Sequence, residues 1–439
     1  MRRSVSSRST DRRRRPERAG RVDVYLFPAI VGGGLGDIEE VLAAGRRLAR
    51  AGASVRLFRA PGRPPPPGVD GPWEWPPLER TGRLRPSAPR ALTVTPAWGV
   101  SAAPAGPPPL GRPGVWDIEA RAIETAYGPD HVVHVSLEEF ARTLPSRDEH
   151  RERFREGGVP ARAIDRRLLR ARAAGEIDAF DRAFRRFRAF DRPDVLHLFA
   201  TFEPARAFAR EFPEAVQTGP LWPGRAPRGA LGRRRPREWV WYASPASAER
   251  IAGAVVAALA NVDPPIHLLV RTPRPWRTVR PGPGLELVAA PLPPARWRMR
   301  FAAAELRIVT GSRSLLEAIE LGGPFLYFNG LLGEGRSRRR HRPEKLRALL
   351  RIARRAPLPP DVVRDLAAFG RGARVADVAH RAAARVGGWS RRWPRLGAVG
   401  FRPPYDDAGV LLERLLDALG ASGSSATEIV ARVRAGSNP

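Results

Sequence analysis

The hydrophobic pattern near the start of the chain predicts a strand, a helix and a second strand. Residues 22–27 (VDVYLF) and 53–59 (ASVRLFR) are rich in strand formers. Between them, the hydrophobic positions of residues 37–51 recur at helical spacing. A strand, a glycine-rich loop, a helix and a strand in this order form the unit from which doubly wound parallel sheets are built.

The same pattern begins again in the second half of the chain. In the first half we also predict strands at 91–95 and 194–199, helices at 115–127, 137–144 and 203–212, and a charged helical region at 147–190. In the second half we predict strands at 239–242, 266–271, 285–289, 305–309 and 325–328, and helices at 247–259, 315–320, 343–354, 361–368 and 406–419.

These elements predict an α/β protein with two Rossmann-like parallel-sheet domains that face a crevice. Proline and glycine clusters set the boundaries between them. We expect a disordered basic arm at 1–21, an N-terminal acceptor domain at 22–220 with a Pro/Gly-rich insertion, a linker at 221–237, a C-terminal donor-binding domain at 238–420 and a polar tail at 421–439.

The charge of the chain changes this picture little. The 439 residues carry 76 Lys and Arg against 45 Asp and Glu, a net charge of +31 that would attract polyanions. Lys345 is the only lysine, however, and arginine is spread along the whole chain without the interleaved aromatics of a nucleic-acid module. We therefore expect no nucleic-acid partner.

Several functions are excluded by what the sequence lacks. The chain has no cysteine, so disulfides, thiolate metal sites and cysteine nucleophiles are ruled out. Its first 21 residues lack the apolar segment of a secretory signal, and the longest apolar stretch, 251–260, is too short to span a bilayer, which takes about 20 residues. We expect a cytoplasmic protein, with an anionic membrane surface open as a peripheral partner.

Two motifs carry candidate chemistry, and the first is the glycine loop GGGLGD at 32–37. Gly33, Gly34 and Gly36 would let backbone N–H groups approach a phosphate or a sugar at the start of a helix. A plain strand-to-helix turn, with Asp37 as its cap, explains the loop equally well. The loop lacks the last glycine of a dinucleotide fingerprint, which disfavours NAD.

The second motif runs from residue 310 to residue 324 and joins a strand end to a short helix. Gly311, Ser312, Ser314 and the helix N-terminus could hold a diphosphate. Glu317 could accept hydrogen bonds from ribose hydroxyls, although a lone helix glutamate is more often solvated. Arg313, and Arg271 at the end of the strand 266–271, are candidate counter-charges for the diphosphate.

The run EAIELGGP at 317–324 resembles the donor-binding segment of GT-B glycosyltransferases, which contains Glu-Ala-x-x-x-Gly-x-Pro. In that family the glutamate binds the donor ribose, so the resemblance implies this role for Glu317. The glycine loop resembles the Gly-Gly-Leu-Gly-Asp loop of glycogen and starch synthases, and more loosely the acceptor-side loop of the muramyl-peptide N-acetylglucosaminyltransferases.

Two positions depart from the retaining members of that family. Starch synthases have a phosphate-binding lysine where Val31 lies, and retaining members with paired glutamates would need an acid at Val309. The missing acid at Val309 favours an inverting reaction. Such a reaction needs a general base for the acceptor hydroxyl. The glycine loop offers Asp37 for this, with the alternatives His131, His134 and His197.

The sequence therefore predicts a glycosyltransferase that moves a sugar from a nucleotide-sugar donor to an unidentified acceptor, which could be a carbohydrate, a lipid-linked molecule or a small molecule. No Asp-x-Asp or His/acid spacing is typical of a metal site, so we expect no metal and no cofactor beyond the nucleotide-sugar co-substrate. A nucleotide-sugar 2-epimerase-like enzyme, a non-catalytic binding protein of the same fold and a nucleic-acid-binding basic protein remain alternatives.

Overall fold

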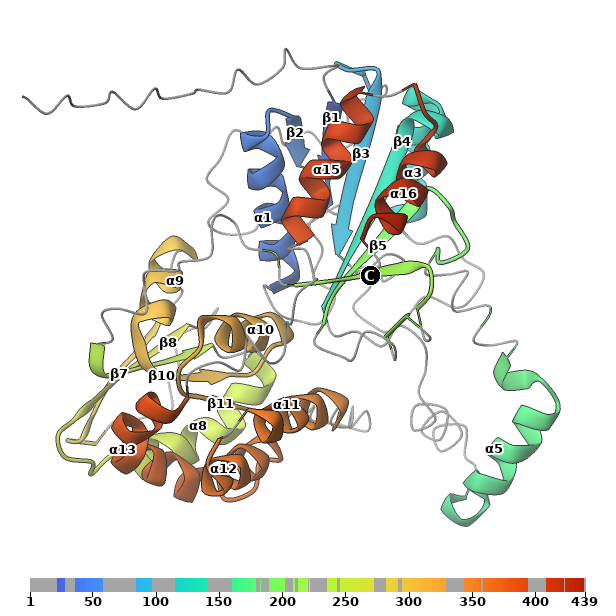
Figure 1. Cartoon of the computed structure of the whole chain (residues 1–439). Helices are drawn as coiled ribbons and strands as arrows, with labels where there is room; N and C mark the ends of the chain where they lie inside the picture. The colour runs from blue at the N-terminus through green and yellow to red at the C-terminus, as the bar shows by residue number, and fades with distance from the viewer. Residues whose placement is uncertain are drawn as a thin grey trace, which may run out of the picture.

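The computed structural model resolves two parallel sheets, each with helices packed against it (Figure 1). It describes residues 22–27, 36–57, 84–96, 115–139, 160–178, 182, 189–201, 208–209, 212–219, 221, 235–242, 245–271, 282–290, 294–328, 343–356, 358–393, 408–421 and 423–437. The predicted fold class, two Rossmann-like domains in one chain, is confirmed. The predicted arm and most of the predicted insertion and linker lie outside the described residues.

The N-terminal sheet contains six parallel strands in the order β2-β1-β3-β4-β5-β6. The strands are β1 (Val22–Leu26), β2 (Ser54–Leu57), β3 (Arg90–Pro96), β4 (Val132–Glu139), β5 (Val195–Ala200) and β6 (Ala215–Thr218). Helices α1 (Gly36–Arg50) and α3 (Val115–Tyr127) pack against this sheet, and α5 (Ile164–Ala173) stands apart from both sheets in Figure 1.

The C-terminal sheet contains five parallel strands in the order β11-β10-β7-β8-β9. The strands are β7 (Arg235–Tyr242), β8 (Ile266–Arg271), β9 (Leu285–Ala290), β10 (Ala304–Val309) and β11 (Phe325–Tyr327). The helices of this domain are α8 (Pro245–Leu259), α9 (Pro294–Ala303), α10 (Ser312–Leu321), α11 (Pro343–Arg355), α12 (Pro360–Gly370) and α13 (Val375–Arg392).

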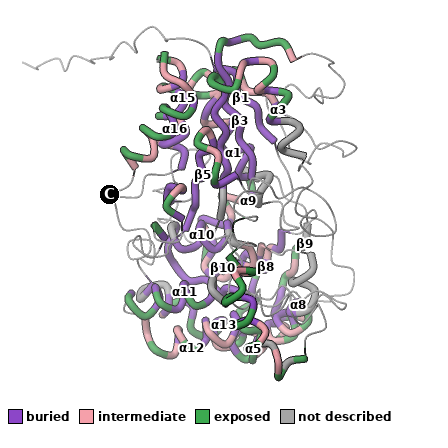
Figure 2. Tube along the Cα trace, turned by 90° about the vertical axis from the view of Figure 1, so that its right-hand side faces the viewer, coloured by how far each residue is buried: buried purple, intermediate pink, exposed green. Residues whose placement is uncertain are grey.

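The central strands read as continuous hydrophobic runs because both of their faces are covered. All residues of β1, β3, β5 and β6 are buried, and Figure 2 shows the strands as the buried interior of each domain. This pattern is typical of parallel sheets with helices on both faces.

Two helices at the end of the chain belong to the N-terminal domain. We expected the donor domain to reach residue 420 and a polar tail to follow, but α15 (Ala408–Ala421) and α16 (Ala426–Ala435) pack on the N-terminal sheet (Figure 1). The buried leucines of α15 share one face: Leu411, Leu412, Leu415, Leu416 and Leu419.

Polar contacts fix both helices in place. On α1, Arg47 Nε donates to Glu413 Oε1 of α15 at 2.8 Å. On α16, Arg434 Nη2 donates to the carbonyl oxygen of Val195, at the start of β5, at 2.6 Å. The helix α16 begins at a capping box formed by Ser425 and Glu428, whose spacing is a helix-start signal in the sequence.

One predicted helix is wrong, and several elements were not predicted. Residues 132–139 form the strand β4, where we expected a helix from residue 137, because β3 and β5 supply hydrogen-bonding partners on both sides. The strand β6 and the helices α9 and α13 were not predicted. Within the charged region predicted as helical, the described residues include α5.

We expect Leu412→Ala to destabilise the N-terminal domain by about 2–5 kcal/mol, because it removes a fully buried side chain from the core between α15 and the sheet. Hydrogen exchange at the amides of β1 and β3 measures the loss. The control is Asp417→Ala on the exposed side of the same helix, which should change stability by less than about 0.5 kcal/mol. Unchanged protection of β1 and β3 in Leu412→Ala would contradict the assignment of α15 to this domain.

Candidate functional site

The order of the strands locates one position in the C-terminal sheet at which a ligand is expected. From β7 the chain passes to β8 and β9 on one side, and later to β10 and β11 on the other. The strand order therefore reverses between β7 and β10. In open parallel sheets, ligands bind outside the carboxyl ends of the strands at such a reversal.

The second sequence motif begins at this reversal. The last register positions of three adjacent strands hold Val309, Tyr242 and Arg271 side by side. Thr310 follows β10 directly, and its Oγ1 donates to the carbonyl oxygen of Tyr242 at 2.8 Å. The loop between β10 and α10 is thus fixed to the neighbouring strand at the carboxyl edge.

Gly311 caps the helix α10 in extended backbone, with φ −97° and ψ 165°. Ser314 Oγ lies 3.2 Å from the Gly311 N and donates to the Gly311 carbonyl oxygen at 3.1 Å. The first turn of a helix presents N–H groups that have no partner within the helix, and these favour anions. The side chain of Ser312 lies outside the described residues.

Glu317 lies one turn further along α10 and is buried, with 8% of its surface exposed. Its Oε1 accepts a hydrogen bond from Arg313 Nε at 3.0 Å. The Nη2 of Arg313 donates to the carbonyl oxygen of Leu221 at 3.3 Å. We had predicted both residues for the site but not their pairing, although the spacing of four residues on a helix is the signal for it.

Arg271 brings a second buried cation to the same edge. Only 6% of its surface is exposed, and its guanidinium carbon lies 5.9 Å from the ring centres of both Tyr242 and Trp297. Contacts of this length between a guanidinium and aromatic faces are attractive. Arg271, Tyr242, Thr310 and the start of α10 therefore lie at the same end of the sheet.

A further arginine, which sequence reasoning missed, fixes the end of the second motif by hydrogen bonds to backbone oxygens. Arg307 on β10 is fully buried. Its guanidinium donates to the carbonyl oxygens of Phe301 at 2.6 Å, Ala302 at 2.9 Å and Gly322 at 2.7 Å. Gly322 and Gly323 have φ of 69° and 83°, a conformation that favours glycine. The Gly-Gly part of the motif is explained by this turn.

The structure describes only part of the glycine loop. Gly33 and Gly34 lie outside the described residues, whereas Gly36 and Asp37 begin α1, with the side chain of Asp37 outside the description. The loop follows β1, which lies between β2 and β3, where the strand order of the N-terminal sheet reverses.

The two switch points face each other across the domains. The strand β3 points toward the C-terminal domain in Figure 1, and Ala200 at the end of β5 joins the C-terminal core. The helices α1 and α10, which follow the two motifs, contact each other. The described start of α1 and the start of α10 thus belong to sheet ends that face each other.

The three histidines considered as bases lie elsewhere. His131 is exposed in the short helical turn before β4, at the amino end of the sheet. His134 and His197 are fully buried within β4 and β5, and His197 stacks on Phe190 with ring centres 4.3 Å apart. These positions are those of structural histidines.

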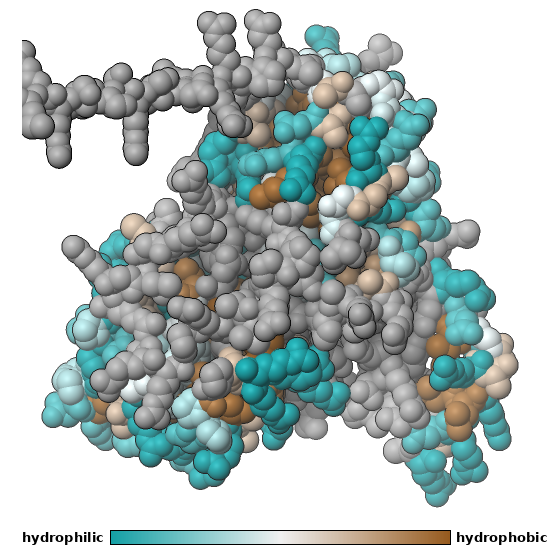
Figure 3. Space-filling model, viewed as in Figure 1, coloured by the Kyte–Doolittle hydropathy of each residue, from teal (hydrophilic) through white to brown (hydrophobic). Residues whose placement is uncertain are grey.

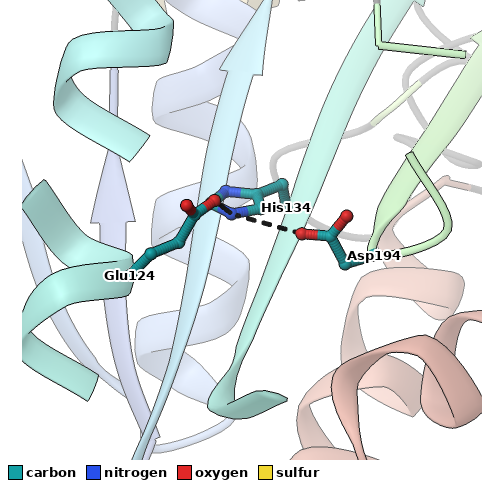
Figure 4. A group of neighbouring side chains, drawn as sticks. All are labelled: Glu124, His134 and Asp194. Carbon is teal, nitrogen blue, oxygen red and sulfur yellow. Dashed lines mark hydrogen bonds and ion pairs between the residues drawn. The ribbon is translucent and has the colours of Figure 1, made fainter. Parts of the chain in front are cut away.

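His134 belongs to a charged cluster at the amino side of the sheet, with Glu124 on α3 and Asp194 before β5 (Figure 4). Its Nε2 lies 2.9 Å from Glu124 Oε1, and its Nδ1 lies 2.6 Å from Thr93 Oγ1. A carboxylate only accepts, so Nε2 carries a proton and donates to Glu124.

The spacing of these three side chains would suit a metal ion, but the guanidinium of Arg192 already pairs with both carboxylates. Arg192 Nη2 donates to Glu124 Oε1 at 2.5 Å and also to Asp194 Oδ2. The hydrogen bond from His134, together with Arg192, lowers the pKa of Glu124 to about 2. The cluster pairs both carboxylates with groups of the chain itself and joins α3, β4 and β5, which indicates a structural role.

An exposed hydrophobic side chain lies among arginines on α5. On α5, Leu169 is 64% exposed between Arg166 and Arg170, which are exposed as well, and Figure 3 shows hydrophobic side chains among hydrophilic ones at this helix. Among the described helices, none combines the length and the apolar character that crossing a membrane requires.

Comparison with known proteins gives no match in sequence and several in fold. No protein-family model matches the chain, and neither does any curated protein. The chain is similar to the glycotransferase of kitacinnamycin at 16% identity, over 90% of this chain and 99% of that one, with a TM-score of 0.46. It is similar to a UDP-glucosyltransferase from Polygonum tinctorium at 12% identity, over 95% and 98% of the two chains, with a TM-score of 0.46.

A third similar structure is MurG of Acinetobacter baumannii, at 12% identity over 83% of this chain and 95% of that one, with a TM-score of 0.37. At this distance the likeness concerns the fold, and the reaction is inferred from the residues of the site.

We expect Glu124→Gln to lower the free energy of unfolding at pH 7 by about 1–2 kcal/mol, because it removes the carboxylate charge that accepts hydrogen bonds from His134 and Arg192. The folded pKa is depressed, so this stability is present above the ordinary value of 4.5 and is lost as the pH falls toward 2. Urea unfolding at several pH values should show the difference from wild type shrinking below pH 4.5.

The matched control is Glu176→Gln, which alters an exposed pair with Arg167 at 2.7 Å and should change stability by less than about 0.5 kcal/mol at any pH. A difference between wild type and Glu124→Gln that stays constant from pH 7 to pH 3 would contradict the charged cluster.

Proposed function

We propose that this protein is a glycosyltransferase that moves a sugar from a nucleotide-sugar donor to an acceptor. One observation carries the proposal: the loop at Gly311, the start of α10 and the buried carboxylate of Glu317 follow the strand at which the C-terminal sheet reverses its order. An anion site and a buried acceptor for hydroxyl donors are thereby one helical turn apart, which suits a nucleoside diphosphate.

In this proposal each group has a separate part. The N-terminus of α10 and the cation of Arg271 attract the diphosphate, and the leaving nucleoside diphosphate is stabilised by the same groups as its charge grows. Glu317 accepts hydrogen bonds from the ribose hydroxyls. The two domains bring donor and acceptor together and exclude water, which favours transfer over hydrolysis.

We propose an inverting, metal-independent reaction with Asp37 as the general base. An inverting transfer is a single displacement that needs one base on the acceptor side, and Asp37 stands at the start of α1, in the glycine loop of the N-terminal domain. Val309 supports this choice, because a retaining member of the resembled kind would have an acid there. The cations of the site, rather than a metal, balance the diphosphate.

The alternatives are separated by what they require. A nucleotide-sugar 2-epimerase-like enzyme would convert its donor without an acceptor, whereas a transferase consumes both. In a binding protein that does no chemistry, Asp37→Asn would leave donor turnover unchanged at zero. A nucleic-acid-binding protein would show steep salt dependence of binding and no response to nucleotide sugars.

We expect one class among UDP-, GDP-, ADP- and dTDP-sugars to raise the melting temperature of the wild type, because a ligand that binds only the folded state stabilises it, by about 2.7 kcal/mol at 100 times Kd. Glu317→Ala should raise Kd at least about tenfold, the effect of losing hydrogen bonds to a charged acceptor.

The graded control is Glu317→Gln, which keeps the volume and one acceptor oxygen. Its Kd should lie between those of the wild type and Glu317→Ala. A nucleotide sugar that stabilises Glu317→Ala as well as wild type would remove Glu317 from the donor site. No response of the wild type to any of the four classes, with salt-sensitive binding to nucleic acid, would overturn the transferase reading.

We expect Gly311→Ala to fold normally and to lose most of its response to the same nucleotide. A Cβ at this position would lie 3.5 Å from Ser314 Oγ and 3.7 Å from Tyr242 Cε1, which are ordinary contacts, so the stability cost should stay under about 1 kcal/mol. The methyl group would, however, stand where the backbone must approach a diphosphate.

Gly253→Ala is the matched control, because a Cβ at this exposed position of α8 meets nothing within 4 Å. Its melting temperature should respond to the nucleotide as the wild type does. An undiminished response of Gly311→Ala would mean that the loop does not approach the diphosphate.

A further inference from the structure

Arg313 connects the proposed donor site with the other domain. Its Nε donates to Glu317 Oε1 at 3.0 Å within α10, and its Nη2 donates to the carbonyl oxygen of Leu221 at 3.3 Å. Leu221 is part of the hydrophobic core on the N-terminal sheet. One guanidinium therefore holds a carboxylate of the C-terminal domain and a backbone oxygen of the N-terminal domain.

The contact of Arg313 with Glu317 and Leu221 is shielded from water. Arg313 is 6% exposed and Glu317 is 8% exposed. The planar fork of a guanidinium can serve two acceptors in fixed directions, whereas the single ammonium of a lysine cannot. A buried charge that loses its partner is costly. If the carboxylate of Glu317 takes a new partner, the guanidinium of Arg313 must therefore change its own contacts.

We propose that Arg313 is the positioning residue through which occupation of Glu317 alters the arrangement of the two domains. The inference rests on the proposed function, because it requires nucleotide hydroxyls at Glu317. Hydroxyls that donate to this carboxylate compete with Arg313 Nε, and a diphosphate at Gly311 attracts the same guanidinium. Both effects draw Arg313 from the carbonyl oxygen of Leu221.

The loss of that hydrogen bond weakens the contact between the two domains. The helices α1 and α10 contact each other there, and α1 begins with the last glycine and the aspartate of the first motif. A donor bound on α10 would thus loosen one bond between the domains beside the proposed acceptor side. By linkage, a change in the domain arrangement changes the affinity for the donor by the same factor.

The experiment measures the distance between the domains with and without nucleotide. Because the chain has no cysteine, Asp417→Cys on α15 and Arg354→Cys on α11 accept two spin labels without further changes. Pulsed electron spin resonance then gives the distance distribution for the full chain and for the same chain with Arg313→Gln, each alone and with UDP, GDP, ADP or dTDP. Arg381→Gln is the matched control, since its pair with Asp365 lies within one domain.

Without nucleotide, we expect Arg313→Gln to change the ratio of domain arrangements by about tenfold, the effect of one hydrogen bond from a charged donor, while Arg381→Gln leaves it unchanged. With the binding nucleotide, the wild type should shift toward the distribution of Arg313→Gln, and the variant should shift little. Arg313→Lys, which keeps the charge but cannot bridge both acceptors, should resemble Arg313→Gln and provides the test if the glutamine variant does not fold.

An unchanged distribution of Arg313→Gln in the absence of nucleotide would overturn the inference, whatever the protein binds. A nucleotide that binds the wild type and shifts both proteins equally would overturn it as well. If no nucleotide binds the wild type, the proposed function fails, and the nucleotide-free comparison still decides whether Arg313 holds the domains together.

Discussion

A parallel sheet has no face that can be left to water, and this constraint governs both domains. The strands are hydrophobic on both sides, so every sheet must be covered twice, and the chain must supply helices for four faces. The C-terminal domain obtains its helices from the residues between and just after its strands. The N-terminal domain obtains α1 and α3 in this way, but α15 and α16, which also cover its sheet, come from the far end of the chain.

All strands of a parallel sheet run in the same direction, so each sheet has an amino end and a carboxyl end, and these two ends hold different side chains. At the amino side of the N-terminal sheet, polar groups are matched to one another: Arg192 with Glu124 and Asp194, and Asp23 with Tyr127 and the backbone N–H groups of residues 87 and 88. At the carboxyl edges the groups are arranged around a loop and a helix start. The first kind of edge joins the fold, and the second offers a place for a ligand.

The sequence predicted most strands because a buried parallel strand is a continuous hydrophobic run bounded by turn residues, as in 22–27 and 266–271. It failed at residues 137–139, where the neighbouring strands decide between strand and helix, and at α16, which looks like a polar tail until its partner is known. For the site, a strand, small residues and a glutamate were enough to indicate the place of Glu317. The pairing of Arg313 with Leu221 joins residues 92 positions apart, and the support from Arg307 depends on where three carbonyl oxygens meet, so neither could be read from a local pattern.

The return of α15 and α16 to the first sheet has a consequence for how the protein is made. The chain crosses between the domains twice, so the C-terminal domain is an insertion within the N-terminal one. A ribosome that synthesises this chain releases all the strands of the first domain early and the helices that close its core last. The second domain, whose strands and helices follow one another in the chain, can complete its core first, while one face of the first sheet stays only partly covered by α1.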